Sequence, residues 1–66
     1  MKIQLNGQPR QFDRSMTVIE LLAQLDLTTE RVAVECNGAI VDRGNFAVHR
    51  VNDNDVVEVV RFVGGG

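Results

Sequence analysis

The chain has 66 residues, enough for one domain but too few for a scaffold that also surrounds a catalytic cleft. Its residues are 44% hydrophobic and 24% charged, which predicts a folded domain. A net charge of −2 without a basic stripe excludes the usual nucleic-acid-binding classes. The single cysteine, Cys36, excludes an internal disulfide and favours a reducing compartment. No apolar run approaches the ~20 residues of a membrane span, so we expect a soluble, cytoplasmic protein with no membrane partner.

The first segment alternates in the way of a strand with one buried face. Met1, Ile3 and Leu5 are separated by polar residues, and Asn6-Gly7 follows as a strong tight-turn signal. A second strand is predicted over residues 8–13. Because Pro9 lacks a backbone N–H, this strand is expected at a sheet edge.

A helix is predicted to begin after Thr17 and to end near Asp26. Thr17 and Glu20 have the spacing of a capping box, in which each side chain accepts a hydrogen bond from the other residue's amide. Met16 is placed to pack on Leu21 across this helix start. The apolar residues at i, i+3, i+4 and i+7 form one stripe, which predicts packing on a sheet. They are Val18, Leu21, Leu22 and Leu25.

Two further strands and an irregular segment follow. Val32, Val34 and Cys36 alternate with other residues as a third strand, which is predicted to turn at Asn37-Gly38 into a fourth. Residues 42–50 have no clear period and predict a loop or short helical turn over Phe46. Four turn-forming residues, 52–55, precede the last strand.

The last strand is predicted over residues 56–62, with Val57 and Val59 on one face and Val60 and Phe62 on the other. The order ββαββ predicts an α+β fold in which one helix packs on a mixed sheet. Eight side chains are expected to form its core. They are Ile3, Leu5, Leu21, Leu22, Leu25, Val34, Val57 and Val59.

Three glycines, Gly64, Gly65 and Gly66, predict a flexible tail (64–66) after a folded domain (1–63). Fully extended, the tail would carry the terminal carboxylate roughly 10 Å beyond Val63, and its lack of side chains suits a narrow channel. The Gly66 carboxylate is a poor electrophile and needs activation, for which a chain this small has no machinery. The residues favour a carrier worked on by partner enzymes; a frayed terminus or an expression scar is the alternative.

Taken together, the order of elements and the glycine end resemble a ubiquitin-like β-grasp protein, and more narrowly the sulfur carriers of thiamine biosynthesis, the ThiS family. The resemblance covers the whole chain, in the hairpin at residues 2–7, the helix at 17–22, the strand at 32–38 and the end at 55–66. One departure is Asn54-Asp55, where the family often has Gly-Asp.

This resemblance implies a protein co-substrate and not an enzyme. A partner adenylyltransferase similar to ubiquitin-activating enzymes would use ATP and magnesium to convert the Gly66 carboxylate to an acyl-adenylate, with Gly64 and Gly65 threading into its active site. Sulfur, passed from cysteine through a desulfurase persulfide, would replace AMP and give a thiocarboxylate. Thiazole synthase would then accept the sulfur. The chain itself is expected to bind no cofactor or metal, and to be a monomer when free.

The open face beside the tail is the predicted docking surface for these partners. Val60 and Phe62 are expected to project from it and to anchor partners; packing against neighbouring strands is the alternative. Arg61, on the other face, is expected to be an ordinary solvated arginine, with steering toward acidic partners as the alternative.

The remaining reactive side chains are interpreted as structural. Cys36 is predicted to point inward and to be inert, although a persulfide acceptor is conceivable chemistry for a thiol. His49 has no ligand partners at metal-binding spacing and is predicted to face solvent in a loop. Asp53 and Asp55 lack the ligand spacing of a calcium loop and are predicted to be turn residues.

Three functions remain open at this point. The chain is a thiamine sulfur carrier, a related carrier for molybdopterin or another sulfur pathway, or a ubiquitin-like modifier or simple binding module. The short length favours the first of these.

Overall fold

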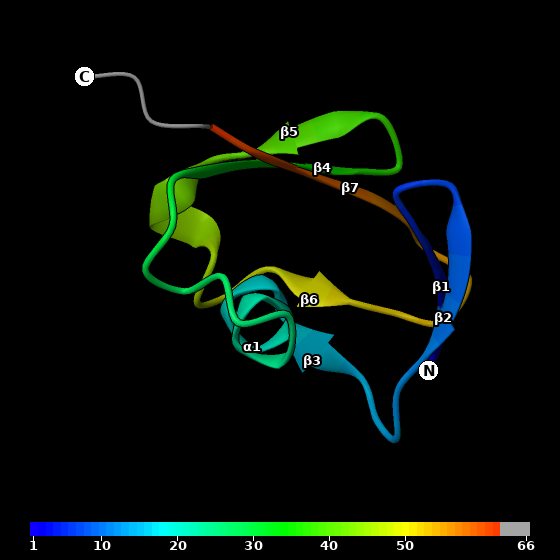
Figure 1. Cartoon of the computed structure of the whole chain (residues 1–66). Helices are drawn as coiled ribbons and strands as arrows, with labels where there is room; N and C mark the ends of the chain where they lie inside the picture. The colour runs from blue at the N-terminus through cyan, green and yellow to red at the C-terminus, as the bar shows by residue number, and fades with distance from the viewer. Residues whose placement is uncertain (63–66) are drawn as a thin grey trace.

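The main sheet has five strands, and the last strand in the sequence lies at its centre. In the computed structural model, which describes residues 1–62, the strand order is β2-β1-β7-β4-β5 (Figure 1). Strand β7 runs parallel to β1, and its pairing with β4 is antiparallel, as are the pairings of β1 with β2 and β4 with β5. The strands are β1 (Lys2–Leu5), β2 (Gln8–Gln11), β4 (Val32–Cys36), β5 (Ala39–Val41) and β7 (Val56–Arg61).

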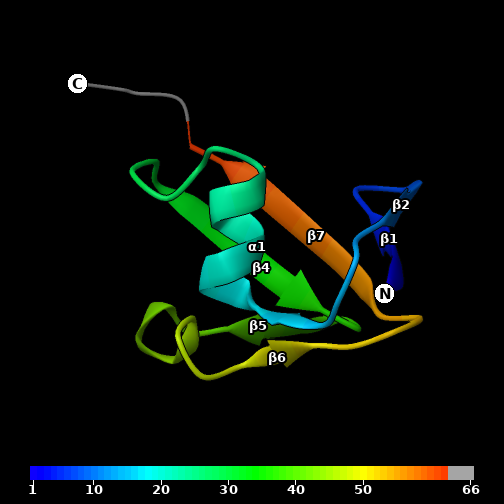
Figure 2. The ribbon, with the colours of Figure 1, turned by 90° about the horizontal axis from the view of Figure 1, so that it is seen from below.

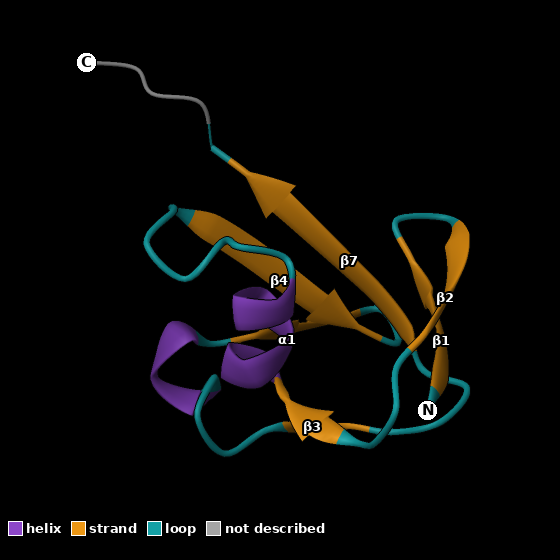
Figure 3. Cartoon of the chain, turned by 60° about the horizontal axis from the view of Figure 1, so that its bottom comes forward, coloured by secondary structure: helices purple, strands orange, loops and turns teal. Residues whose placement is uncertain are grey.

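One helix, α1 (Val18–Gln24), covers one face of this sheet and lies over β4 in both Figures 2 and 3. The predicted α+β fold with a mixed sheet is therefore confirmed. A second sheet of two short strands, β3 (Met16–Thr17) and β6 (Arg50–Val51), was not predicted, because strands of two residues leave no periodicity in the sequence. Within residues 1–62, no helix is long and apolar enough to cross a membrane.

Both Asn-Gly pairs form the predicted hairpin turns. Their four residues all have positive φ, at 51° and 80° for Asn6 and Gly7 and at 52° and 85° for Asn37 and Gly38. Two consecutive left-handed residues define the type I′ turn, which matches the twist of the flanking strands. Strand β2 lies at the sheet edge with every side chain exposed, as Pro9 predicted.

The two turn asparagines also hold the central strand. The Asn6 side chain accepts a hydrogen bond from the Val59 amide (2.8 Å) and donates one to the Val59 carbonyl (3.2 Å). The Asn37 side chain accepts from the Val56 amide (2.8 Å), and the Asn37 amide donates to the Val56 carbonyl (2.7 Å). Strand β7 is thereby fixed near its start by one hairpin and near its middle by the other.

The predicted capping box begins α1. The Thr17 hydroxyl accepts from the Glu20 amide (3.3 Å), and the Glu20 carboxylate accepts from the Thr17 amide (2.8 Å). These bonds from Thr17 lower the pKa of Glu20. The helix ends at Gln24, and Asp26 has a positive φ of 60°, so the predicted end near Asp26 is confirmed to within two residues.

The irregular segment before β6 contains a 3₁₀ turn, η1 (Arg43–Asn45), and buries Phe46, as predicted. Its carbonyl groups complete the start of the helix. The Val18 amide donates to the His49 carbonyl and the Ile19 amide to the Phe46 carbonyl, each over 2.9 Å. The first amides of a helix have no partner within it, so this segment supplies bonds that the helix needs.

Helix, sheet and irregular segment enclose one hydrophobic core. Seven of the eight predicted core side chains are buried, and Leu25 is half-buried at the end of the helix. Val41 and Val51 are also buried although they were not placed in the core from the sequence. The buried side chains are Ile3, Leu5, Met16, Val18, Leu21, Leu22, Val32, Val34, Cys36, Val41, Phe46, Val51, Val57 and Val59.

The turn before β7 is organised by one carboxylate. Asn54 has φ of 70°, a conformation that glycine adopts freely and asparagine tolerates, so the departure from Gly-Asp preserves the turn geometry. Asp55 accepts hydrogen bonds from the Asn52 amide (2.8 Å) and the Asn37 side chain (3.0 Å). Partial desolvation raises the pKa of Asp55, but these bonds and one from Cys36 outweigh it and hold the pKa below its ordinary value of 3.8.

Asp55 makes the stability of the fold sensitive to acid. Because its pKa is lower in the folded than in the unfolded chain, its contribution is complete above pH 3.8 and is lost as the pH falls through the folded pKa. We expect Asp55→Asn to lower the free energy of unfolding at pH 7 by about 1 kcal/mol, the net worth of a hydrogen bond near the surface. Denaturant unfolding at pH 7 and pH 3 measures this, and an equal pH dependence in both proteins would contradict it.

Candidate functional site

The carboxyl end of β7 leads directly into the glycine tail. The structure describes the chain up to Phe62, and residues 63–66 lie outside the described part. The threading role of Gly64 and Gly65, the chemistry at Gly66 and the division into a domain (1–63) and a flexible tail (64–66) therefore stay predictions. What the structure defines is the platform from which the tail departs.

This platform has an exposed apolar surface on the side of the sheet away from α1. Val60 is 54% exposed and Phe62 is 58% exposed. On β4, Ala33 lies directly opposite Val60, while Val57 and Val59 alternate inward and are buried. The exposure of Val60 and Phe62 agrees with their predicted positions, and their role as anchors for partners stays a prediction.

The same face carries two carboxylates. Glu35 on β4 lies directly opposite Glu58 on β7, and Ile40 on β5 lies opposite Glu35 with 75% of its surface exposed. Among the described residues, no Lys, Arg or His nitrogen lies within 4.0 Å of either carboxylate. Like charges directly opposite on neighbouring strands repel, so this face is complementary to an apolar surface that also carries a cation.

Arg61 is exposed to solvent, as expected from the sequence, and it also forms an ion pair that was not predicted. Its guanidinium lies 3.5 Å from the Glu30 carboxylate, from Nη1 to Oε1. Arg61 is directly opposite Val32, a buried residue, which places it on the opposite side of the sheet from Val60. Nothing in the local sequence links Arg61 to Glu30; only the register of β4 and β7 brings them together.

Cys36 is buried, with 7% of its surface exposed, as its alternation predicted. Its thiol donates a hydrogen bond to the Asp55 carboxylate over 3.6 Å, from Sγ to Oδ2. Burial raises the pKa of the Cys36 thiol, and the negative charge of Asp55 raises it further. Since the thiolate is the reactive form, this environment supports the interpretation of Cys36 as structural.

The other candidate side chains serve the fold. The Asp53 carboxylate accepts a hydrogen bond from the Lys2 amide over 2.7 Å, so Asp53 and Asp55 are both turn residues, as predicted. His49 lies in a loop, as predicted, and is half-buried, and its backbone carbonyl accepts from the Val18 amide at the helix start. In the part of the chain that the structure describes, no group of three or more His, Cys, Asp and Glu residues is arranged to hold a metal ion.

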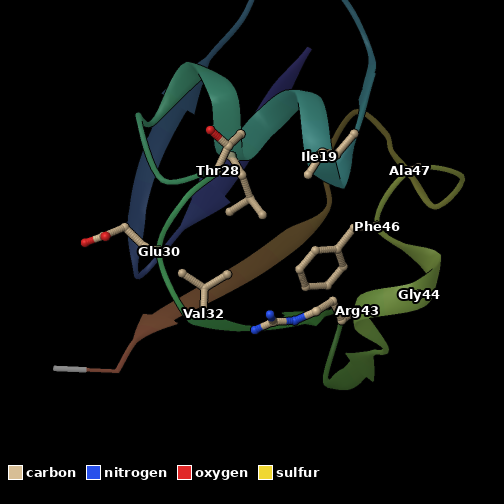
Figure 4. A pocket seen from close by; sticks show the side chains of 9 residues that line it. Ile19, Thr28, Glu30, Val32, Arg43, Gly44, Phe46 and Ala47 are labelled. Carbon is tan, nitrogen blue, oxygen red and sulfur yellow. The ribbon is translucent and has the colours of Figure 1, made fainter. Parts of the chain in front are cut away.

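A pocket of about 230 Å³ lies between α1, the loop before β4 and η1 (Figure 4). Its lining includes two charged side chains, Glu30 and Arg43, and three core side chains, Leu22, Val32 and Phe46. The three core side chains are each 6% exposed or less, so an occupant would contact little of their apolar surface, and Ile19, at 37%, is the more exposed apolar side chain of the lining. The end of β7 is therefore the stronger candidate site.

A mixed sheet of this strand order crossed by one helix defines a ubiquitin-like β-grasp protein. The model of the ThiS family matches residues 3–66, and the chain belongs to this family. A crystal structure titled thiamine biosynthesis protein (ThiS), from Geobacter metallireducens, superposes with a TM-score of 0.85 at 39% identity, and each chain is covered completely.

The curated relatives that match the chain include a sulfur carrier and a thiazole synthase. The sulfur carrier protein ThiS of Escherichia coli is 38% identical over 66 residues, which is all of both proteins. A thiazole synthase of Paramagnetospirillum magneticum is 47% identical over the same 66 residues. The chain spans 20% of the length of that thiazole synthase.

The buried thiol gives a direct test of the interpretation of Cys36. We expect an aromatic disulfide reagent to react with Cys36 at least about tenfold more slowly in the folded chain than in denaturant at the same pH, because burial reduces both thiolate and access. Absorbance of the released thiol measures both rates. Equal rates would contradict a structural role and would reopen Cys36 as a sulfur acceptor.

Proposed function

We propose that the chain is a sulfur carrier of thiamine biosynthesis and a co-substrate, not an enzyme. The observation that carries this proposal is that the family match extends over residues 3–66 and so includes Gly64, Gly65 and Gly66. Those are the residues to which the chemistry is assigned. The related carrier ThiS of Escherichia coli, which is 38% identical over 66 residues, supports the proposal.

The proposed chemistry takes place at the Gly66 carboxyl group. A partner adenylyltransferase uses ATP and magnesium; a carboxylate oxygen attacks the α-phosphate, pyrophosphate leaves, and an acyl-adenylate forms. The terminal sulfur of a cysteine desulfurase persulfide then attacks the carbonyl carbon, AMP leaves, and an acyl disulfide forms. A second thiol attacks the desulfurase sulfur of this acyl disulfide, so that a new disulfide forms and the acyl thiolate leaves. The product is a thiocarboxylate, a better sulfur nucleophile than a carboxylate is an oxygen nucleophile, held covalently so that no free sulfide is released.

The proposed acceptor of the sulfur is thiazole synthase. Support comes from the relatives named thiazole synthase, in which a region similar to this whole chain occupies 20% of a longer polypeptide. The carrier is proposed to act in the cytoplasm as a monomer when free. Val60 and Phe62 are proposed to anchor partners, with the unneutralised pair Glu35 and Glu58 favouring a partner surface that carries a cation.

Two other functions share this fold and tail. A carrier for molybdopterin or another pathway would form the same thiocarboxylate but deliver it to a different acceptor, and a modifier would join Gly66 to lysine side chains. The family match and the thiazole synthase relatives favour the thiamine pathway.

Intact mass spectrometry tests the proposal. With the adenylyltransferase, ATP, magnesium, a persulfide donor and a thiol that cleaves the acyl disulfide, we expect a mass gain equal to replacement of one oxygen by sulfur, absent without ATP. A chain lengthened or shortened by one glycine is the control, because the position of the carboxylate sets the chemistry. Adducts linked to lysine would identify a modifier instead, and no mass change in the complete mixture would reject the carrier function.

The proposed anchors are tested by charged substitutions. We expect Val60→Asp and Phe62→Asp each to lower kcat/KM for adenylation about tenfold or more, because a carboxylate would be placed in an apolar contact. Val48→Asp is the matched control: Val48 is 71% exposed and lies between η1 and β6, away from this face. Circular dichroism checks that the variants fold. If both folded variants are adenylated at the wild-type rate, Val60 and Phe62 are not anchors for the adenylyltransferase.

A further inference from the structure

The end of β7 is held by two contacts from one short segment. The Arg61 guanidinium lies 3.5 Å from the Glu30 carboxylate. On the adjoining residues, the Phe62 amide donates a hydrogen bond of 2.9 Å to the Arg31 carbonyl, one position beyond the end of the strand. A side-chain contact and a backbone contact thus join residues 30–31 to residues 61–62.

That segment is itself fixed to the helix. The Glu30 amide donates to the Leu27 carbonyl over 3.1 Å, and the Leu27 amide donates to the Leu22 carbonyl of α1 over 2.8 Å. Leu27 packs against the core as a partly buried side chain. Figure 4 shows the Glu30 carboxylate pointing away from Phe46 and from the interior of the pocket, and its cation partner is Arg61.

We propose that Glu30 and Arg61 form a clamp that sets where the rigid body ends, and so positions the Gly66 carboxyl group for the partner enzyme. This inference deepens the function proposed above and rests on it. Beyond the clamped residues the chain continues for four residues, 63–66, which span at most about 14 Å when fully extended. When Arg61 and Phe62 are held in place, the Gly66 carboxyl group can lie only within this distance of Phe62.

Opening the clamp would add Arg61 and Phe62 to the segment that must be ordered in the partner's active site. Each residue fixed there costs conformational entropy, and a longer tether lowers the effective concentration of its end. Both clamp side chains are about half exposed, at 57% and 43%, so water screens the pair. An exposed pair of this kind shifts an equilibrium by about 1.5- to 5-fold. The clamp therefore acts on turnover and leaves the overall fold intact.

The test uses the full-length variants Glu30→Gln and Arg61→Gln and the charge-swapped double variant, Glu30→Arg with Arg61→Glu. In each single variant we expect the Phe62 amide to exchange about 1.5- to 5-fold faster by NMR, and kcat for adenylation to fall by a similar factor at unchanged KM. The swapped pair restores both values. Arg14→Gln is the control, since it removes another exposed ion pair, with Glu20 at 3.9 Å, remote from β7 in the sequence.

Unchanged exchange at Phe62 and unchanged kcat in both single variants would overturn the clamp. A lower kcat without faster exchange would overturn it too, because Glu30 and Arg61 would then act by touching the partner directly. If the wild-type chain is never adenylated, the proposed function fails and the positioning role fails with it. That result is seen in the wild type and is therefore distinct from failure of the clamp alone.

Discussion

Strand β7 lies between two neighbours in the centre of the sheet. Its first residues, Val56 and Val57, pair parallel with β1, and its pairing with β4 is antiparallel and continues to Arg61. A parallel pair requires a crossover, and the segment containing α1 supplies it. Asn6 and Asn37 add side-chain bonds to Val59 and Val56. The last strand in the sequence is thus an interior strand of the sheet, so the residues that follow it continue from a paired segment and not from a frayed edge.

Much of this architecture can be predicted from short sequence signals. The Asn-Gly pairs determine both hairpins because few residues tolerate two successive positive φ values, and the spacing of Thr17 and Glu20 determines the helix start through two reciprocal bonds. Alternation placed Val57 and Val59 inward and Val60 outward. Each of these signals lies within a few residues of the chain, so it can be recognised without knowledge of the tertiary structure.

What the sequence could not provide is register between distant segments. The pair Glu30 and Arg61, the facing carboxylates Glu35 and Glu58, and the bonds to Asp55 all depend on which residue of β7 meets which residue of its neighbours. The burial of Val51 could not be predicted for the same reason, because it follows from the pairing of the two-residue strand β6 with β3. The chemistry proposed for residues 64–66 stays a prediction from the sequence, whereas the arrangement of the platform required the fold.

The distribution of nucleophiles is consistent with the proposal that Gly66 carries an activated acyl group. An acyl-adenylate acylates amines and thiolates. A carrier with few accessible amines and thiolates is therefore less exposed to acylation of its own side chains. The sequence has one lysine, Lys2, and its other basic side chains besides His49 are arginines, whose guanidinium groups stay protonated and do not compete. Cys36 is buried and held as a thiol beside Asp55, and the amino group of Met1 donates to the Phe12 carbonyl over 2.8 Å. The same sequence offers a modifier that builds chains on itself one lysine as an acceptor, the exposed Lys2.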